Sequence, residues 1–121
     1  MGHLFECGGK EIWDPSNRPA ELYLALLKST TDVFDLPTGL TSRASDWHII
    51  DLPEYGQMVQ GLLATRGNTG HLYLCRMLDG LLPLCIALYE AAGGTVIPAT
   101  QREREYLAEV HAMDLPMGYA P

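Results

Sequence analysis

Residues 71–92 constrain the fold more than any other part of the chain, because they are apolar almost all the way round a helix. A helix of that kind lies at the centre of a domain. Its most apolar part is about a dozen residues long, well short of the roughly 20 that a bilayer requires. Pro83 removes a backbone donor and clashes with the carbonyl of Asp79, which predicts a kink or break there. We therefore expect a core helix that does not span a membrane.

Three further helices are predicted around this segment. Residues 18–33 carry apolar side chains at helical spacing, with Pro19 in the first turn. The pairs Asp51 with Glu54 and Thr100 with Glu103 have capping-box spacing and predict the starts of two more helices, the second ending near residue 113.

Two short segments with strand character complete the pattern. Residues 4–7 and 10–13 flank Gly8-Gly9, and a two-residue Gly-Gly loop suits a primed hairpin turn. Residues 95–97 read as a short strand next to Pro98 and could join that hairpin as a third strand.

The fold class that follows is α+β and dominated by helices. About four helices pack with a small N-terminal β-hairpin and a third strand near residues 95–97. With 121 residues, 47% of them apolar, residues 1–121 form a single domain with one core. The residues expected in that core are Leu62, Leu81, Leu84, Leu88 and Val110.

Residues 35–50 have no clear period, and so long an irregular stretch in a small domain is often functional. A short strand at residues 47–50 is an equally good interpretation of its end. Arg43, Trp47 and His48 are the residue types that binding surfaces use, so we predict a binding site here. The alternative is that Trp47 folds back as a lid on the core.

The charge balance excludes two classes of partner. Fifteen acidic residues against eight basic ones give a net charge of −7, which disfavours nucleic acids and anionic membranes. The three cysteines are an odd number without metal-like spacing, which predicts free thiols and a reducing, cytoplasmic compartment. We expect no metal and no cofactor.

No catalytic motif is present, so candidate catalytic residues come from looser groupings. Asp46 lies close to His48 and could orient its imidazole as in a general base, although such an Asp often caps a turn. His71 and Cys75 share a helical face, as in an activated thiolate or half of a zinc site. Packing and capping are the simpler roles for both.

Two further features could form a small-molecule site. Glu90 interrupts a very apolar helix, where burial would raise the pKa of its carboxyl and suit it to acid–base work. Exposure at the helix end is the alternative. Several tyrosines could orient a ligand inside an interhelical cavity, or simply pack at the edges of the apolar stripes. They are Tyr23, Tyr55, Tyr73, Tyr89 and Tyr106.

The opening hairpin ends in Ile12-Trp13-Asp14-Pro15-Ser16-Asn17 and runs into a leucine-rich helix. In this, and in the helix that begins near Asp51, the chain resembles a family of small uncharacterised actinobacterial proteins. That family has no assigned activity, so the resemblance implies a bacterial cytoplasmic setting and no catalytic residues.

Two functions from different classes remain. The first is a non-enzymatic domain that docks on a protein partner, similar to an immunity protein or antitoxin. It rests on small size, acidity and the lack of a reactive group of residues.

The alternative is a small acid–base enzyme, of cyclase or isomerase type, acting on an apolar small molecule of a bacterial biosynthetic pathway. A homodimeric structural or regulatory domain is a third reading. A closed pocket lined by tyrosines would favour the enzyme, and a filled core with an exposed patch would favour the binding domain.

Overall fold

The computed structural model describes residues 2–115 of the chain. Within this range two β-hairpins are separated by one helix, and four more helices follow them. Their order is β1 (Leu4–Cys7), β2 (Lys10–Trp13), α1 (Asn17–Val33), β3 (Leu40–Ala44), β4 (Trp47–Ile50), α2 (Leu52–Asn68), α3 (Leu72–Asp79), α4 (Leu82–Ala91) and α5 (Gln101–Met113).

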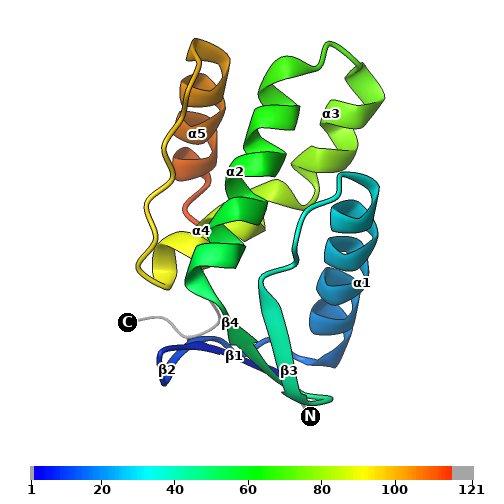
Figure 1. Ribbon diagram of the computed structural model, residues 1–121, viewed down its shortest axis with the longest axis vertical. Helices are drawn as coiled ribbons and strands as arrows, with labels where there is room; N and C mark the ends of the chain where they lie inside the picture. The colour runs from blue at the N-terminus through cyan, green and yellow to red at the C-terminus, as the bar shows by residue number, and fades with distance from the viewer. Residues whose placement is uncertain (1, 116–121) are drawn as a thin grey trace.

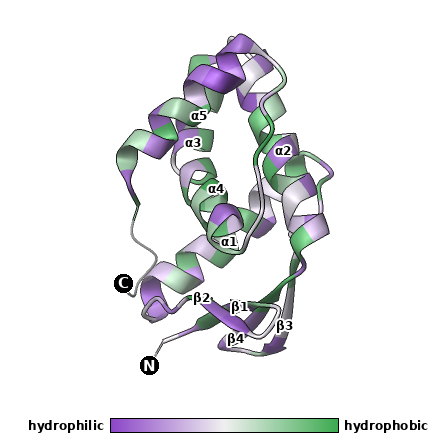
Figure 2. Ribbon diagram, turned by 90° about the vertical axis from the view of Figure 1, so that its left-hand side faces the viewer, coloured by the Kyte–Doolittle hydropathy of each residue, from purple (hydrophilic) through white to green (hydrophobic). Residues whose placement is uncertain are grey.

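The strands form one sheet at one end of the helices, so the predicted helix-dominated α+β class is confirmed (Figure 1). The strand order is β2-β1-β4-β3, in which β1 runs antiparallel to β2 and parallel to β4. The N-terminal hairpin is therefore present as predicted. Helix α4 lies near the centre of the helices, with the sheet below it (Figure 2).

The third strand considered near residues 95–97 is absent, because this segment pairs with no strand of the described range. The side-chain amide of Gln60 replaces a neighbouring strand: it accepts from Ile97 N at 2.7 Å and donates to Ile97 O at 2.9 Å. The additional strands are instead β3 and β4, which occupy most of the stretch expected to be irregular. The strand considered at residues 47–50 is thereby confirmed.

The long apolar segment breaks between α3 and α4, as Pro83 predicted. Pro83 lies in the first turn of α4, where its missing N–H costs no helical hydrogen bond. The two helices meet at a bend of 40°, which makes five helices in the described range where about four were expected. No single described helix is long and apolar enough to cross a membrane, and only the bent pair α3–α4 reaches that length and composition together.

The N-cap hydrogen bonds expected from both predicted capping boxes are present. Asp51 accepts a hydrogen bond from Glu54 N at 3.1 Å, and Thr100 Oγ accepts from Glu103 N at 3.1 Å. The buried Glu103 carboxylate returns the contact by accepting from Ala99 N and from the Thr100 hydroxyl. Local sequence therefore defines where α2 and α5 begin.

Gly39 allows the chain to run close to α2 before it enters β3. Its φ of +72° is a left-handed conformation, and an added Cβ would collide with the backbone of Tyr55. Its carbonyl accepts from Asp51 N at 2.8 Å. Gly39 therefore couples the start of β3 to the start of α2.

The core contains four of the five residues predicted for it: Leu62, Leu81, Leu88 and Val110 are at most 4% exposed. Leu84 is only half-buried, so its assignment to the full core is wrong. It lies on a side of α4 shared with Ala87 and Ala91, which are also half-buried, and the neighbouring helices cover that side incompletely.

We expect Leu88→Ala to lower the free energy of unfolding by about 2–5 kcal/mol, because it removes a fully buried side chain and leaves a cavity. The matched variant Leu84→Ala should cost clearly less, since its site is open to solvent and can relax. Urea unfolding of both variants measures the difference. Equal losses would contradict this description of α4.

Candidate functional site

A chain of three polar side chains crosses the sheet from β3 to the segment before β1. His3 Nδ1 lies 3.0 Å from His48 Nε2, and His48 Nδ1 lies 2.8 Å from Ser42 Oγ. The two imidazoles are stacked, with centroids 5.2 Å apart and planes 9° apart. His3 and His48 are buried, whereas Ser42 is exposed. The arrangement links a surface hydroxyl to a buried pair of titratable rings.

Sheet pairing creates this Ser42–His48–His3 chain. Ser42 and His48 face each other in the antiparallel β3–β4 register. The parallel pairing of Leu4 with Trp47 then brings His3 to His48. Sequence reasoning selected His48 but did not connect it to Ser42 or His3. A prediction of the β3–β4 hairpin would have placed Ser42 opposite His48.

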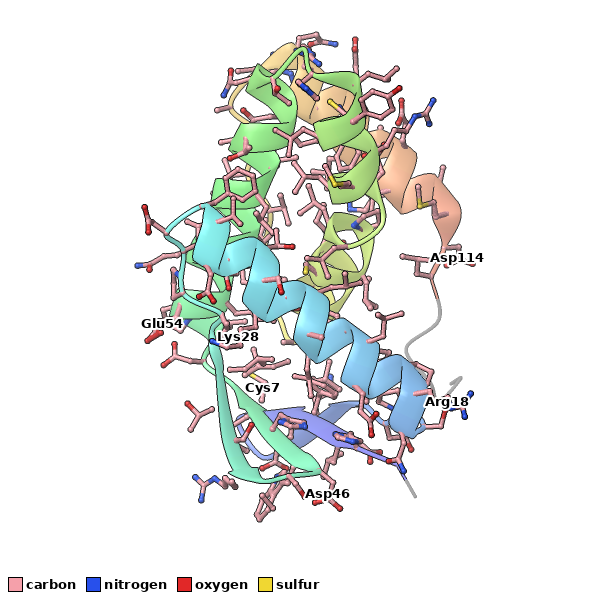
Figure 3. All side chains as sticks on the ribbon, turned by 90° about the vertical axis from the view of Figure 1, so that its right-hand side faces the viewer. Cys7, Arg18, Lys28, Asp46, Glu54 and Asp114 are labelled. Carbon is pink, nitrogen blue, oxygen red and sulfur yellow. The ribbon has the colours of Figure 1, made fainter. Side chains whose placement is uncertain are left out.

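Burial lowers the pKa of His48, and the neighbouring His3 ring lowers it further, while the Asp46 carboxylate acts in the opposite direction. His48 is therefore held neutral at neutral pH, with one ring nitrogen as donor and the other as acceptor. Asp46 lies at the tip of the β3–β4 hairpin (Figure 3), and its backbone carbonyl accepts from Leu4 N at 2.8 Å. Asp46 therefore acts on His48 only through its charge. The hydrogen-bond partners that orient the His48 ring are Ser42 and His3.

Two open hollows lie beside His3 and share Gly2, His3 and Asp46 in their linings. Glu21 borders one of them and Asp14 the other. The ring that ends the polar chain thus lies next to an acidic surface depression. Chemically, this arrangement can move a proton between the surface and the His3–His48 pair.

The other catalytic candidates are held in structural roles. His71 is the N-cap of α3 and accepts from Leu74 N at 3.3 Å. Cys75 is buried and donates its thiol to Thr69 O at 3.9 Å. Neither contact joins His71 to Cys75. Among residues 2–115 no three His, Cys, Asp or Glu side chains are grouped to hold a metal ion.

Glu90 is half-buried and is hydrogen-bonded to His111, whose Nε2 lies 2.8 Å from Glu90 Oε2. This pair joins α4 to α5 on the surface. The prediction of Glu90 as a buried acid therefore gives way to its stated alternative at the exposed helix end. His111 was missed because it is 21 residues away in sequence.

Three of the tyrosines named above, Tyr23, Tyr55 and Tyr106, are buried and contact other side chains. Tyr23 and Tyr55 are buried and share a hydrogen bond of 2.5 Å between their hydroxyls, with Cys85 Sγ 3.9 Å from the Tyr23 hydroxyl. Burial raises the pKa of the Cys85 thiol to about 12, so it stays protonated and unreactive. Tyr106 packs against the guanidinium of Arg66, 4.7 Å from the ring centroid. These rings therefore fill the core.

Arg43 and Trp47 form a surface pair on the β3–β4 hairpin. The Arg43 guanidinium lies 5.6 Å from the centroid of the Trp47 ring. Trp47 is 39% exposed and is absent from the apolar core cluster, so the alternative of a core lid does not hold. The third predicted binding residue, His48, points into the Ser42–His48–His3 chain.

A second exposed feature lies on α1 and α3. Large apolar side chains are exposed on both helices, and we call them the α1–α3 face; of these, Val33 and Met77 line one common groove. The side chains of this face are Leu22 (61% exposed), Leu26 (42%), Val33 (74%), Tyr73 (73%) and Met77 (68%). A groove of about 210 Å³ separates the two helices, and its lining carries no charged side chain: Ser29, Thr30, Val33, Phe34, Leu74, Met77 and Leu78.

The chain belongs to the family described as "Family of unknown function (DUF6086)", whose model matches residues 1–119. It matches no curated protein and no solved structure. The resemblance to an uncharacterised family is thereby confirmed. Any function must be argued from the geometry of the chain itself.

We predict that Trp47→Ala lowers the free energy of unfolding by about 1 kcal/mol, because it removes an exposed cation–π contact. The matched change Trp13→Ala, at a side chain only 8% exposed, should cost about 3–5 kcal/mol. Chemical unfolding compares the two. If Trp47→Ala lowers the free energy of unfolding as much as Trp13→Ala does, Trp47 covers the core as a lid after all.

Stability should fall as the pH is lowered from 7.5 to 5.5. The pKa of His48 is lower in the folded chain than in the unfolded one, so protonation favours unfolding. Its contribution is complete above the unfolded pKa of about 6.5 and is lost as the pH falls through the folded value. Urea melts of wild type and His48→Gln at both pH values measure this, and the variant should show the smaller difference. Identical pH dependence in the two proteins would contradict the prediction.

Proposed function

We propose that this chain is a non-enzymatic protein-binding domain that docks on a protein partner through the α1–α3 face. The observation that carries the proposal is the exposure of five large apolar side chains on α1 and α3, two of which, Val33 and Met77, line one groove between these helices. Exposed apolar surface that gathers at a groove often marks an interaction site.

The shape of the face supports a helical partner segment. Leu22 and Leu26 are four residues apart on α1, as are Tyr73 and Met77 on α3, so each pair forms a ridge along its helix. The uncharged groove between α1 and α3 suits the apolar stripe of an amphipathic helix. Figure 3 shows the outer side of α1 uncovered by other elements.

The filled interior also favours a binding domain over an enzyme. Tyr23 and Tyr55 are bonded to each other within the core, where a tyrosine-lined ligand cavity would need their hydroxyls turned to a ligand. The alternative of a small acid–base enzyme acting on an apolar small molecule rests on the Ser42–His48–His3 chain, which adjoins the hollows beside His3.

We further propose a bacterial, actinobacterial origin and a cytoplasmic setting, with a role like that of an immunity protein or antitoxin. The three free thiols suit a reducing compartment. The net charge of −7 suits a basic protein partner and disfavours nucleic acid.

The test uses a library of amphipathic helical peptides selected on the immobilised full chain. Peptides selected on the wild type should lose at least tenfold in affinity for Leu26→Glu and for Met77→Glu, because each places a charge in the apolar face. The matched control is Ile97→Glu, which makes the same change at a side chain 69% exposed outside the face. This control should keep wild-type affinity.

Two outcomes would overturn the proposal. One is that selection yields no peptide that binds the folded chain. The other is that the peptides bind Leu26→Glu and Met77→Glu as well as they bind the control. Circular dichroism of each variant establishes that the fold is retained.

A further inference from the structure

The outer side of α1 has the spacing of a coiled-coil seam. Pro19, Leu22, Leu26, Ser29 and Val33 follow one another at intervals of three, four, three and four residues, and all five are exposed. The core side of the same helix is formed by Ala20, Tyr23, Leu27 and Thr31. A helix that already has a buried stripe thus carries a second, heptad-spaced stripe facing solvent.

We infer that the occupant of this seam is a second copy of the chain, with the two α1 helices packed antiparallel about a two-fold axis. This inference rests on the proposed docking surface and assigns a second copy of the chain to the α1 part of it. It follows from the heptad spacing together with the charges beside the seam.

Those charges are complementary only in the antiparallel arrangement. Arg18 and Asp32 flank the seam on the same side, fourteen residues apart, with the small Ala25 midway between them. Antiparallel packing brings Arg18 near the partner's Asp32 and Asp32 near the partner's Arg18. Parallel packing would instead place Arg18 level with the partner's Arg18. Two opposite-charge pairs therefore select the antiparallel dimer.

The apolar contacts agree with this register. Leu22 comes level with the partner's Leu26, and the two-fold axis repeats the contact, so the central layers are leucine on leucine. The small side chain of Ala25 allows the helices to approach closely at the axis. On α3, the exposed Met77 lines a groove with Ser29, Thr30 and Val33 of α1 and can extend the interface beyond one helix.

Both charged residues are available for a partner. Arg18 makes no ion pair with any other residue of the described range 2–115, and Figure 3 shows it at the start of α1. Asp32 contacts Lys28 Nζ at 3.5 Å in an exposed pair, which stabilises the helix little.

The test is a charge swap read by sedimentation velocity of the full chain over a concentration series. The wild type should dimerise, and Arg18→Asp and Asp32→Arg should each raise the dissociation constant at least tenfold by bringing like charges together. The double variant restores opposite charges and should return to within about threefold of the wild type. Arg104→Asp, the same charge change on α5, is the matched control and should leave dimerisation unchanged.

Loss of folding does not explain such a result, because both substitutions suit the helix dipole: each puts the favoured sign at its end of α1. Thermal melts of the single variants should therefore match or exceed the wild type. A wild type that stays monomeric at about 1 mM overturns the inference, as do single variants that dimerise normally or a double variant that is not rescued. Peptide selection on the monomer then shows separately whether the face binds another protein.

Discussion

The parallel pairing of β1 with β4 is the contact on which the rest of the structure depends. It joins two hairpins that are local in sequence into one sheet, and it brings His3 against His48. Parallel strands cannot be joined by a tight turn, so the chain must cross over between them. That crossover contains α1, whose Tyr23 packs against Phe5 and Trp13 of the first hairpin. The inner side of α1 is consequently committed to the core, and its outer side remains free.

Most of the titratable and polar side chains in the interior form hydrogen bonds or ion pairs that stabilise the fold. The buried hydroxyls of Tyr23 and Tyr55 satisfy each other, and the buried Glu103 carboxylate completes its own helix cap. Arg66 is held by Asp79 at 2.8 Å. These contacts satisfy polar groups whose burial without a partner would destabilise a small core. The Ser42–His48–His3 chain is the exception, because it joins two buried imidazoles to an exposed hydroxyl.

The sequence predicted elements better than it predicted sites. Helix starts at Asp51 and Thr100, the break before Pro83 and the N-terminal hairpin all depend on residues close together in the chain, and all are confirmed. The strand predicted at residues 95–97 was wrong because a side chain, not a strand, satisfies Ile97. The partners of His48 and Glu90 were missed because His3 and His111 are 45 and 21 residues away.

By itself the sequence determined the helix-dominated class, the acidic surface and the central apolar segment, because capping, periodicity and charge act over a few residues or over the whole composition. The sequence also contains the heptad spacing on α1. That helix has two apolar stripes, however, and the sequence alone does not say which of them faces the core. Only the tertiary structure decided between them, since the sheet and core cover the side of Tyr23 and Leu27 and leave Leu22 and Leu26 in solvent. The choice is made by packing between segments distant in sequence, which no local pattern encodes.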